Sequence, residues 1–132
     1  MFKNVLFPID QNRETRDAVA IVSNIVKTYG SKLFLLSVIE KFADDDSIMS
    51  DQDTVAQLLA GAKELFAQEN IDAETIEREG MASFLICDVA DEVEANLIIM
   101  GCRGLGLTQE GAEDSVTNRV INLAPCPVLV VP

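Results

Sequence analysis

Short apolar runs alternate with amphipathic helical patterns along the whole chain. Runs rich in Val, Ile and Leu predict strands, and apolar residues that recur three or four positions apart predict helices. We expect strands at Asn4 to Ile9, Lys32 to Val38, Ile71 to Arg78, Asn96 to Met100 and Pro127 to Val131, and helices at Arg13 to Tyr29, Thr54 to Glu69, Ser83 to Val93 and Ser115 to Leu123. The third strand alternates between apolar and polar residues, which is typical of an edge strand. The last strand, in contrast, is predicted to be buried from Val128 to Val131.

Local signals place the ends of several elements. Pro8 has no N–H and suits the point where the first strand turns toward the surface. Gly30 is placed to end the first helix, and Thr54 is placed to cap the second. The stretch from Glu40 to Asp53 is acid-rich and aperiodic, and we predict a loop there. Its run Asp44 to Asp46 lacks the glycine and glutamate of an EF-hand, so solvated charges explain it better than a cation site.

The order of these elements predicts an α/β fold in a single domain, residues 1–132. Buried strands joined by right-handed crossover helices fit an open, doubly wound, five-stranded parallel sheet of order 3-2-1-4-5, with helices on both faces. The winding reverses between the first and fourth strands, and ligands of such sheets bind there, beyond the carboxyl ends of the strands. The residues just past those ends are Asp10 and the stretch Gly101 to Gly104.

The stretch from Met100 to Gly106 is a glycine-rich loop that leads from a buried strand toward a short helix opened by Ser115. Such a loop lets backbone N–H groups approach an anionic ligand, and a helix N-terminus favours negative charge. The pattern is therefore typical of a phosphate site. One residue opposes this interpretation, because Asp114 places a carboxylate immediately before Ser115.

The net charge of the chain limits the classes of partner that we expect for it. Its 132 residues include 22 acidic and 10 basic residues and no histidine, for a formal net charge of -12. This charge disfavours nucleic acid and anionic membranes as partners, and the missing histidine removes the most common general base. No apolar run reaches the roughly 18 residues of a membrane span, and the amino-terminal residues lack the pattern of a cleavable signal peptide. We therefore expect a cytoplasmic protein.

The three cysteines, Cys87, Cys102 and Cys126, show no CxxC spacing. Without histidine they do not form a recognisable zinc site, and we expect neither haem nor flavin. We interpret all three as reduced thiols, with Cys87 and Cys126 as small core residues. Cys102 lies in the glycine loop, where redox chemistry would need a more electropositive setting than Arg103 alone supplies.

Three segments together resemble the universal stress protein family: LFPID at Leu6 to Asp10, MGCRGLG at Met100 to Gly106, and DSVTNRVINLAPCPVLVV at Asp114 to Val131. The resemblance covers essentially the whole chain and implies an adenine nucleotide alpha hydrolase-like fold. Nucleotide-binding members carry the pattern G-x2-G-x9-G-[ST]. Gly101 and Gly104 match its first two positions and Ser115 its last, whereas Asp114 occupies the position of the third glycine.

The resemblance implies a nucleotide site made of residues from both sides of the switch point. Asp10, with Pro8 beside it, matches the adenine and ribose side, and Val38 matches the residue against the base. The loop around ribose and phosphates corresponds to Met100, Gly101, Arg103 and Gly104, and the phosphate-binding helix start to Asp114, Ser115, Val116 and Thr117. Simpler roles remain open: a turn or cap for Asp10 and Ser115, a surface charge for Arg103, and a core position for Val38.

Asp114 is expected to weaken the phosphate half of this site. A carboxylate about 4 Å from a phosphate oxygen costs roughly 4 kcal/mol at an effective dielectric constant near 20. Glu110 and Glu113 add to this repulsion, and Arg103 and Arg119 are the nearby bases in sequence. A bridging Mg²⁺ would reconcile carboxylate and phosphate. We therefore expect adenosine or AMP to bind at least as well as ATP.

Three functions follow as hypotheses. The first is a non-catalytic homodimer that binds an adenine nucleotide in a stress response, joined through Pro127 to Val131, with a protein partner that the sequence does not identify. The second is an interaction module of the same fold that binds no nucleotide. The third is a slow ATPase, which would need a metal ion and a base to activate water.

Overall fold

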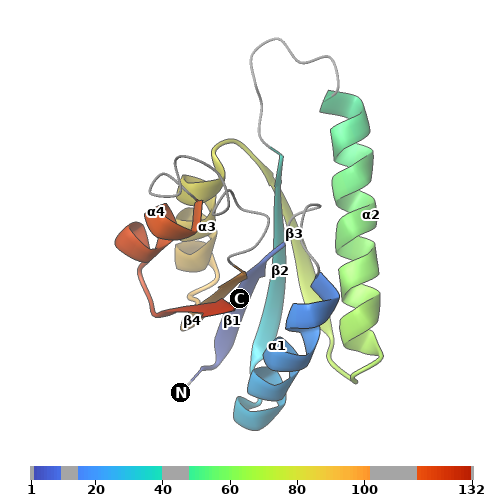
Figure 1. Cartoon of the computed structure of the whole chain (residues 1–132), viewed down its shortest axis with the longest axis vertical. Helices are drawn as coiled ribbons and strands as arrows, with labels where there is room; N and C mark the ends of the chain where they lie inside the picture. The colour runs from blue at the N-terminus through green and yellow to red at the C-terminus, as the bar shows by residue number, and fades with distance from the viewer. Residues whose placement is uncertain (1, 10–14, 40–47, 102–115, 132) are drawn as a thin grey trace.

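The computed structural model describes residues 2–9, 15–39, 48–101 and 116–131. Within them, five parallel strands form one sheet of order β3-β2-β1-β4-β5. The strands are β1 (Asn4–Pro8), β2 (Lys32–Ile39), β3 (Ala73–Glu79), β4 (Leu97–Gly101) and β5 (Val128–Val131); the helices are α1 (Thr15–Tyr29), α2 (Ile48–Ala67), α3 (Ala82–Glu92) and α4 (Val116–Leu123). Helices α1 and α2 cover one face of the sheet, and α3 and α4 cover the other (Figure 1). The predicted fold class and strand order are confirmed.

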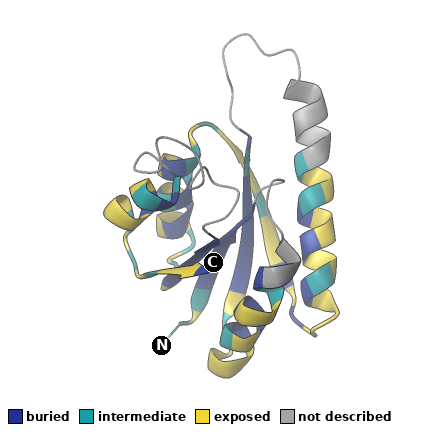
Figure 2. Ribbon diagram, viewed as in Figure 1, coloured by how far each residue is buried: buried dark blue, intermediate teal, exposed yellow. Residues whose placement is uncertain are grey.

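Two apolar layers hold the helices against the sheet. Successive residues of a strand point to opposite faces, so Leu6 and Phe7 of β1 enter different layers. Phe7 packs toward α1 and α2, where its ring meets that of Phe66 edge-on with centroids 6.1 Å apart. Leu6 packs with Met100 in the layer under α3 and α4. Figure 2 shows the consequence, a sheet whose central strands are buried and whose helices are exposed outside.

The second helix is longer than the sequence predicts. Helix α2 begins at Ile48, so the prediction of a loop from Glu40 to Asp53 is wrong for its last part, and Thr54 lies inside the helix instead of capping it. Residues 48–53 contain neither glycine nor proline, so nothing in their backbone chemistry stops the helix from extending toward its N-terminus. The remainder of that predicted loop lies outside the described residues.

The two edge strands differ from each other. Strand β3 is exposed along most of its length, as an edge strand should be, although it begins at Ala73 and not at Ile71. Strand β5 is the other edge, and the prediction that it is buried is wrong: Leu129 and Val130 are each 37% exposed. In the described part of the chain no strand pairs with its outer side, which explains the exposure.

At the amino edge of the sheet, Asn4 ties β1 to the end of α3. Its Nδ2 donates to the carbonyl oxygens of Val93 at 2.9 Å and of Glu94 at 3.3 Å, and its backbone N–H donates to Oδ1 of Asn96 at 3.0 Å. Glu94 has a positive φ of 54°, which reverses the chain after the helix. Carbonyls at a helix C-terminus lack donors from their own helix, and Asn4 supplies them.

Candidate functional site

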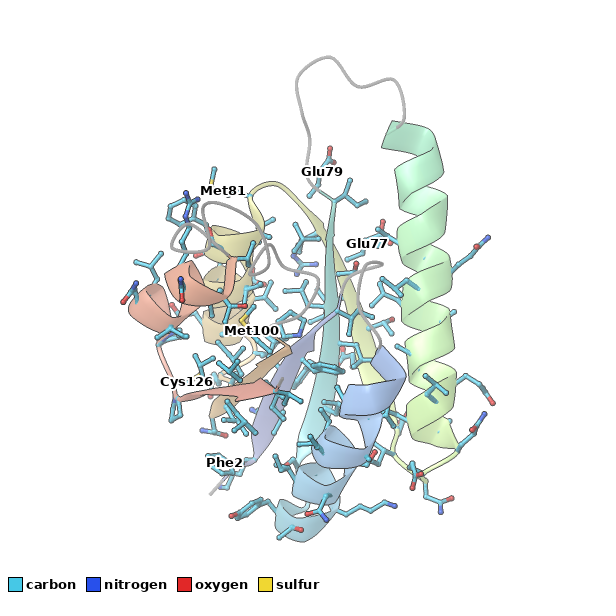
Figure 3. The ribbon with its side chains drawn as sticks, viewed as in Figure 1. Phe2, Glu77, Glu79, Met81, Met100 and Cys126 are labelled. Atoms are coloured by element: carbon cyan, nitrogen blue, oxygen red, sulfur yellow. The ribbon has the colours of Figure 1, made fainter. Side chains whose placement is uncertain are left out.

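The carboxyl ends of the strands lie at one edge of the sheet, together with the start of α4. In Figure 3 this is the edge near Glu79 and Met81, whereas Phe2 marks the opposite edge. Among the residues that the sequence assigns to a nucleotide site, the structure places six in the elements that reach this edge: Pro8, Val38, Met100, Gly101, Val116 and Thr117. The other five, Asp10, Arg103, Gly104, Asp114 and Ser115, lie outside the described residues.

The pairing of β1 with its neighbours changes near this edge. Strand β1 pairs with β2 along its whole length, but within the described residues its register with β4 covers only Val5 and Leu6. The Ile9 N–H donates to the Leu36 carbonyl of β2 at 2.8 Å. Backbone groups of successive strand residues point to alternate sides, so the nitrogen of Pro8 faces β4, where it has no hydrogen to donate. The ladder between β1 and β4 therefore ends at the switch point.

This arrangement corrects the prediction for Pro8. Its side chain is buried and does not turn toward the surface, because β1 is the central strand and helices cover both faces. The sequence pattern pointed to the end of the strand correctly but missed what the proline does there. The signal was available: proline cannot continue the ladder of a central strand, and the predicted order places this strand in the centre.

Thr117 connects the start of α4 to the end of β4. The residue is 2% exposed, and its Oγ1 donates to the carbonyl oxygen of Gly101 at 3.3 Å. This distance is longer than the usual 2.7–2.8 Å of an O–H···O bond. Gly101 also pairs with Val131 of β5. Three elements therefore meet at Gly101, and the Thr117 hydroxyl is directed into the protein.

Val38 and Met100 occupy the same face of the sheet, toward α3 and α4. Met100 is 1% exposed, and Val38 is half-buried against the same apolar cluster. Figure 3 shows Met100 on β4, between the helices and the central strands. The structure thus gives Val38 a core contact and leaves part of its surface accessible near the carboxyl edge.

The charged groups near this edge are mainly acidic among the described residues. Glu77 and Glu79 end β3 and are exposed. The base between them, Arg78, forms an ion pair with Glu92 of α3, with Nη2 and Oε2 3.3 Å apart. Arg119 follows Thr117 by two residues and therefore points to roughly the opposite side of α4, where its Nη1 lies 4.0 Å from Sδ of Met81. Arg119 does not point toward Gly101.

The described cysteines pack as hydrophobic residues. Cys87 and Cys126 are half-buried against the apolar cluster under α3 and α4. Burial raises the pKa of the Cys87 thiol, and the carboxylates of Asp88 and Asp91 raise it further. Burial also raises the pKa of Cys126, with smaller effects from Cys87 and Asp91. Both thiols are therefore protonated near neutral pH, which suits packing and not reactivity; Cys102 lies outside the described residues.

The described residues form neither a metal site nor a membrane span. No three cysteine, aspartate or glutamate side chains come close enough there to hold a metal ion. No helix of that part of the chain is long and apolar enough to cross a membrane.

The fold and its switch point define a doubly wound α/β protein, a class in which ligands bind beyond the carboxyl ends of the strands at the switch point. The sequence pattern that describes the universal stress protein family matches residues 1–132, and this chain belongs to that family. Universal stress protein Sll1654 of Synechocystis is 59% identical to it over 136 aligned residues, which cover 100% of this chain and 87% of that protein.

Solved structures of universal stress proteins have the same fold. One in complex with cAMP superimposes with a TM-score of 0.81 at 20% identity, covering 99% of this chain and 97% of that one. Another, from Archaeoglobus fulgidus in complex with dAMP, has a TM-score of 0.80 at 18% identity and covers 99% and 98% of the two chains. At such identities the similarity shows the fold.

Proposed function

We propose that this protein binds an adenine nucleotide as a non-catalytic homodimer and acts in a stress response in the cytoplasm. One observation carries the nucleotide site: the described register between β1 and β4 stops after Leu6, and the next nitrogen that faces β4 is that of Pro8, at the switch point where doubly wound sheets bind ligands. Proteins of the same family and fold have been solved with cAMP and with dAMP. No catalytic step is proposed, because the chain has no histidine to serve as a general base.

The proposed ligand is recognised mainly through its nucleoside. Val38 is apolar and partly accessible and Gly101 has no side chain, so both suit a base and ribose, and Asp10 follows β1 in the sequence. On the phosphate side, Glu110, Glu113 and Asp114 precede α4 and repel added negative charge. Each further phosphate should therefore cost affinity unless a metal ion such as Mg²⁺ compensates for the carboxylates.

We predict that AMP binds at least as tightly as ATP when no divalent metal is present. Titration calorimetry with AMP, ATP and adenosine, with and without Mg²⁺, measures this directly. Mg²⁺ should strengthen ATP binding more than AMP binding. Tighter binding of ATP than of AMP in metal-free buffer would contradict the proposal, and absence of binding for all three would remove the nucleotide site altogether.

The variant Asp114→Gly tests, in the same assay, whether the Asp114 carboxylate weakens ATP binding. Removing this carboxylate should raise ATP affinity by about thirtyfold, the equivalent of roughly 2 kcal/mol after screening, and should leave adenosine affinity unchanged. The matched control is Asp72→Gly, which makes the same charge change in an exposed residue at the opposite edge of the sheet. An equal gain in ATP affinity for both variants would mean that only net charge matters.

The proposed dimer uses the edge of β5. Strand β5 has the sequence VLVV with no charged residue, and its outer side is open in the described part of the chain. The opposite edge, β3, has the sequence AETIERE, and charged side chains on an edge strand oppose pairing with a second chain. Of the two edges of the described sheet, the β5 edge is therefore the one that suits strand pairing between two copies.

A second candidate is an interaction module of the same fold that binds no nucleotide. The observation that favours it is the Thr117 hydroxyl, which donates to Gly101 and is not directed at a ligand. The calorimetry above separates the two candidates, because the module would bind neither adenosine nor any adenine nucleotide. A co-purifying nucleotide in freshly isolated protein would exclude it.

A further inference from the structure

The first turn of α4 contains a side-chain hydroxyl, that of Thr117, which already has a hydrogen-bond partner within the protein. Thr117 lies in the part of the sequence that the family resemblance assigns to phosphate contacts. In the structure it is 2% exposed and its Oγ1 donates to the Gly101 carbonyl. A hydroxyl has a single hydrogen to donate, and an ionised phosphate oxygen can only accept. While this bond exists, Thr117 cannot donate to a phosphate.

We propose that Thr117 is a positioning residue: its hydroxyl tethers the start of α4 to the end of β4, and it does not contact the ligand. The tether fixes the first turn of α4 relative to Gly101, the last residue of β4, at the carboxyl edge of the sheet. The inference rests on the proposed nucleotide site, which it makes more specific.

The surroundings of the tether favour this role. Gly101 is held from the other side by its register with Val131 of β5, so the acceptor is fixed by the sheet. On α4, Thr117 and Val120 are the buried residues, and Val120 contributes only apolar contact. The hydroxyl of Thr117 is thus a directional link between this helix and β4 on the buried side.

The position of the tether predicts how binding should depend on the ligand. The bond joins Thr117 to the Gly101 carbonyl, so a ligand seated against Gly101 would benefit from the tether whether or not it has a phosphate. Adenosine and AMP should depend on Thr117 equally, whereas a direct phosphate contact would matter for AMP alone.

The test compares Thr117→Val, which keeps the shape but loses the hydroxyl, with Thr117→Ser, which keeps the hydroxyl. Thr117→Val should weaken adenosine and AMP binding by the same factor, about three- to tenfold, and Thr117→Ser should bind both nearly as the unmodified protein does. The control is Thr28→Val in α1, which removes an exposed hydroxyl that donates to the Asn24 carbonyl at 2.7 Å and should change neither affinity.

Three results would overturn the inference: a loss confined to AMP, which means phosphate contact; no loss for either ligand; or an equal loss in Thr117→Ser, which means that packing and not the hydroxyl matters. Hydrogen exchange without ligand provides a test independent of binding. Thr117→Val should speed exchange in the first turns of α4 relative to α3, and Thr117→Ser should not. If the unmodified protein bound neither ligand, the proposed function would fail while hydrogen exchange still decided the tether.

Discussion

Pro8 is a single residue that limits the hydrogen bonding between two neighbouring strands. The residue is buried in the central strand and removes one donor on the side of β4. The same residue in an edge strand would only protect that edge. Here it cannot continue the ladder between β1 and β4, at the switch point where doubly wound sheets bind ligands.

We predict that Pro8→Ala lowers AMP affinity about threefold or more, because a restored N–H can extend the ladder and hold the two strands together where the ligand binds. Stability should change by less than about 1 kcal/mol, since one added hydrogen bond offsets the greater freedom of the unfolded chain. Calorimetry and urea denaturation measure the two effects. Pro125→Ala, at an exposed position before β5, is the control, and an equal change in AMP affinity in both variants would refute the role of Pro8.

At the scale of elements, helices and strands are joined by a few polar contacts at their ends. Asn4 of β1 donates hydrogen bonds to carbonyl groups at the end of α3. In the same way, Thr117 of α4 donates a hydrogen bond to the carbonyl group of Gly101 at the end of β4. Apolar layers cannot supply this directionality, since their packing constrains a helix less at its ends. The two contacts lie at opposite edges of the sheet, and we predict separate consequences for them: Asn4 should affect stability and Thr117 should affect binding.

Asn4→Ala should lower the free energy of unfolding by about 1–2 kcal/mol, because it leaves carbonyl groups at the end of α3 without their donor. AMP affinity should not change, since Asn4 lies at the edge away from the proposed site. Urea denaturation monitored by circular dichroism measures the first quantity. Asn122→Ala, on the exposed side of α4, should be neutral within about 0.5 kcal/mol. A similar loss in both variants would show that Asn4 has no special role.

The whole molecule has two sheet edges with different chemistry. Strand β3 is charged along its exposed length, whereas β5 is apolar and partly exposed. The Ile98 N–H donates to the Pro127 carbonyl, so by alternation the backbone groups of Val128 and Val130 point away from β4. Among the described residues no strand pairs with them on that side, so they suit pairing with the strand of a second copy in the proposed dimer.

Leu129→Lys should convert the proposed dimer into a monomer, because it places a charge on each copy of a paired apolar edge. Light scattering coupled to size-exclusion chromatography at micromolar concentration measures the mass. Ile21→Lys in α1 is the control, since Ile21 has a similar exposure, 41% against 37% for Leu129, and lies away from β5. A monomeric unmodified protein would contradict the dimer directly, and dissociation of both variants would contradict the use of β5.

The sequence by itself determined the fold class, the strand order and the family. The reason is local: buried parallel strands and amphipathic helices leave periodic apolar patterns, and right-handed crossovers permit few topologies for them. The start of α2 was misjudged because an acid-rich stretch without glycine or proline is compatible with both loop and helix. The exposure of Leu129 was missed because its apolar composition indicated burial, although the predicted strand order already placed this strand at an edge.

The tertiary structure alone decided which neighbours Pro8 and Thr117 face. The nitrogen of Pro8 is on the side of β4, and the hydroxyl of Thr117 lies within reach of the Gly101 carbonyl. Hydrogen bonds depend on direction and on partners distant in the chain, so sequence periodicity does not encode them. Burial of apolar residues has no such directionality, which is why the sequence could predict the layers of this protein but not the contacts at the ends of its strands.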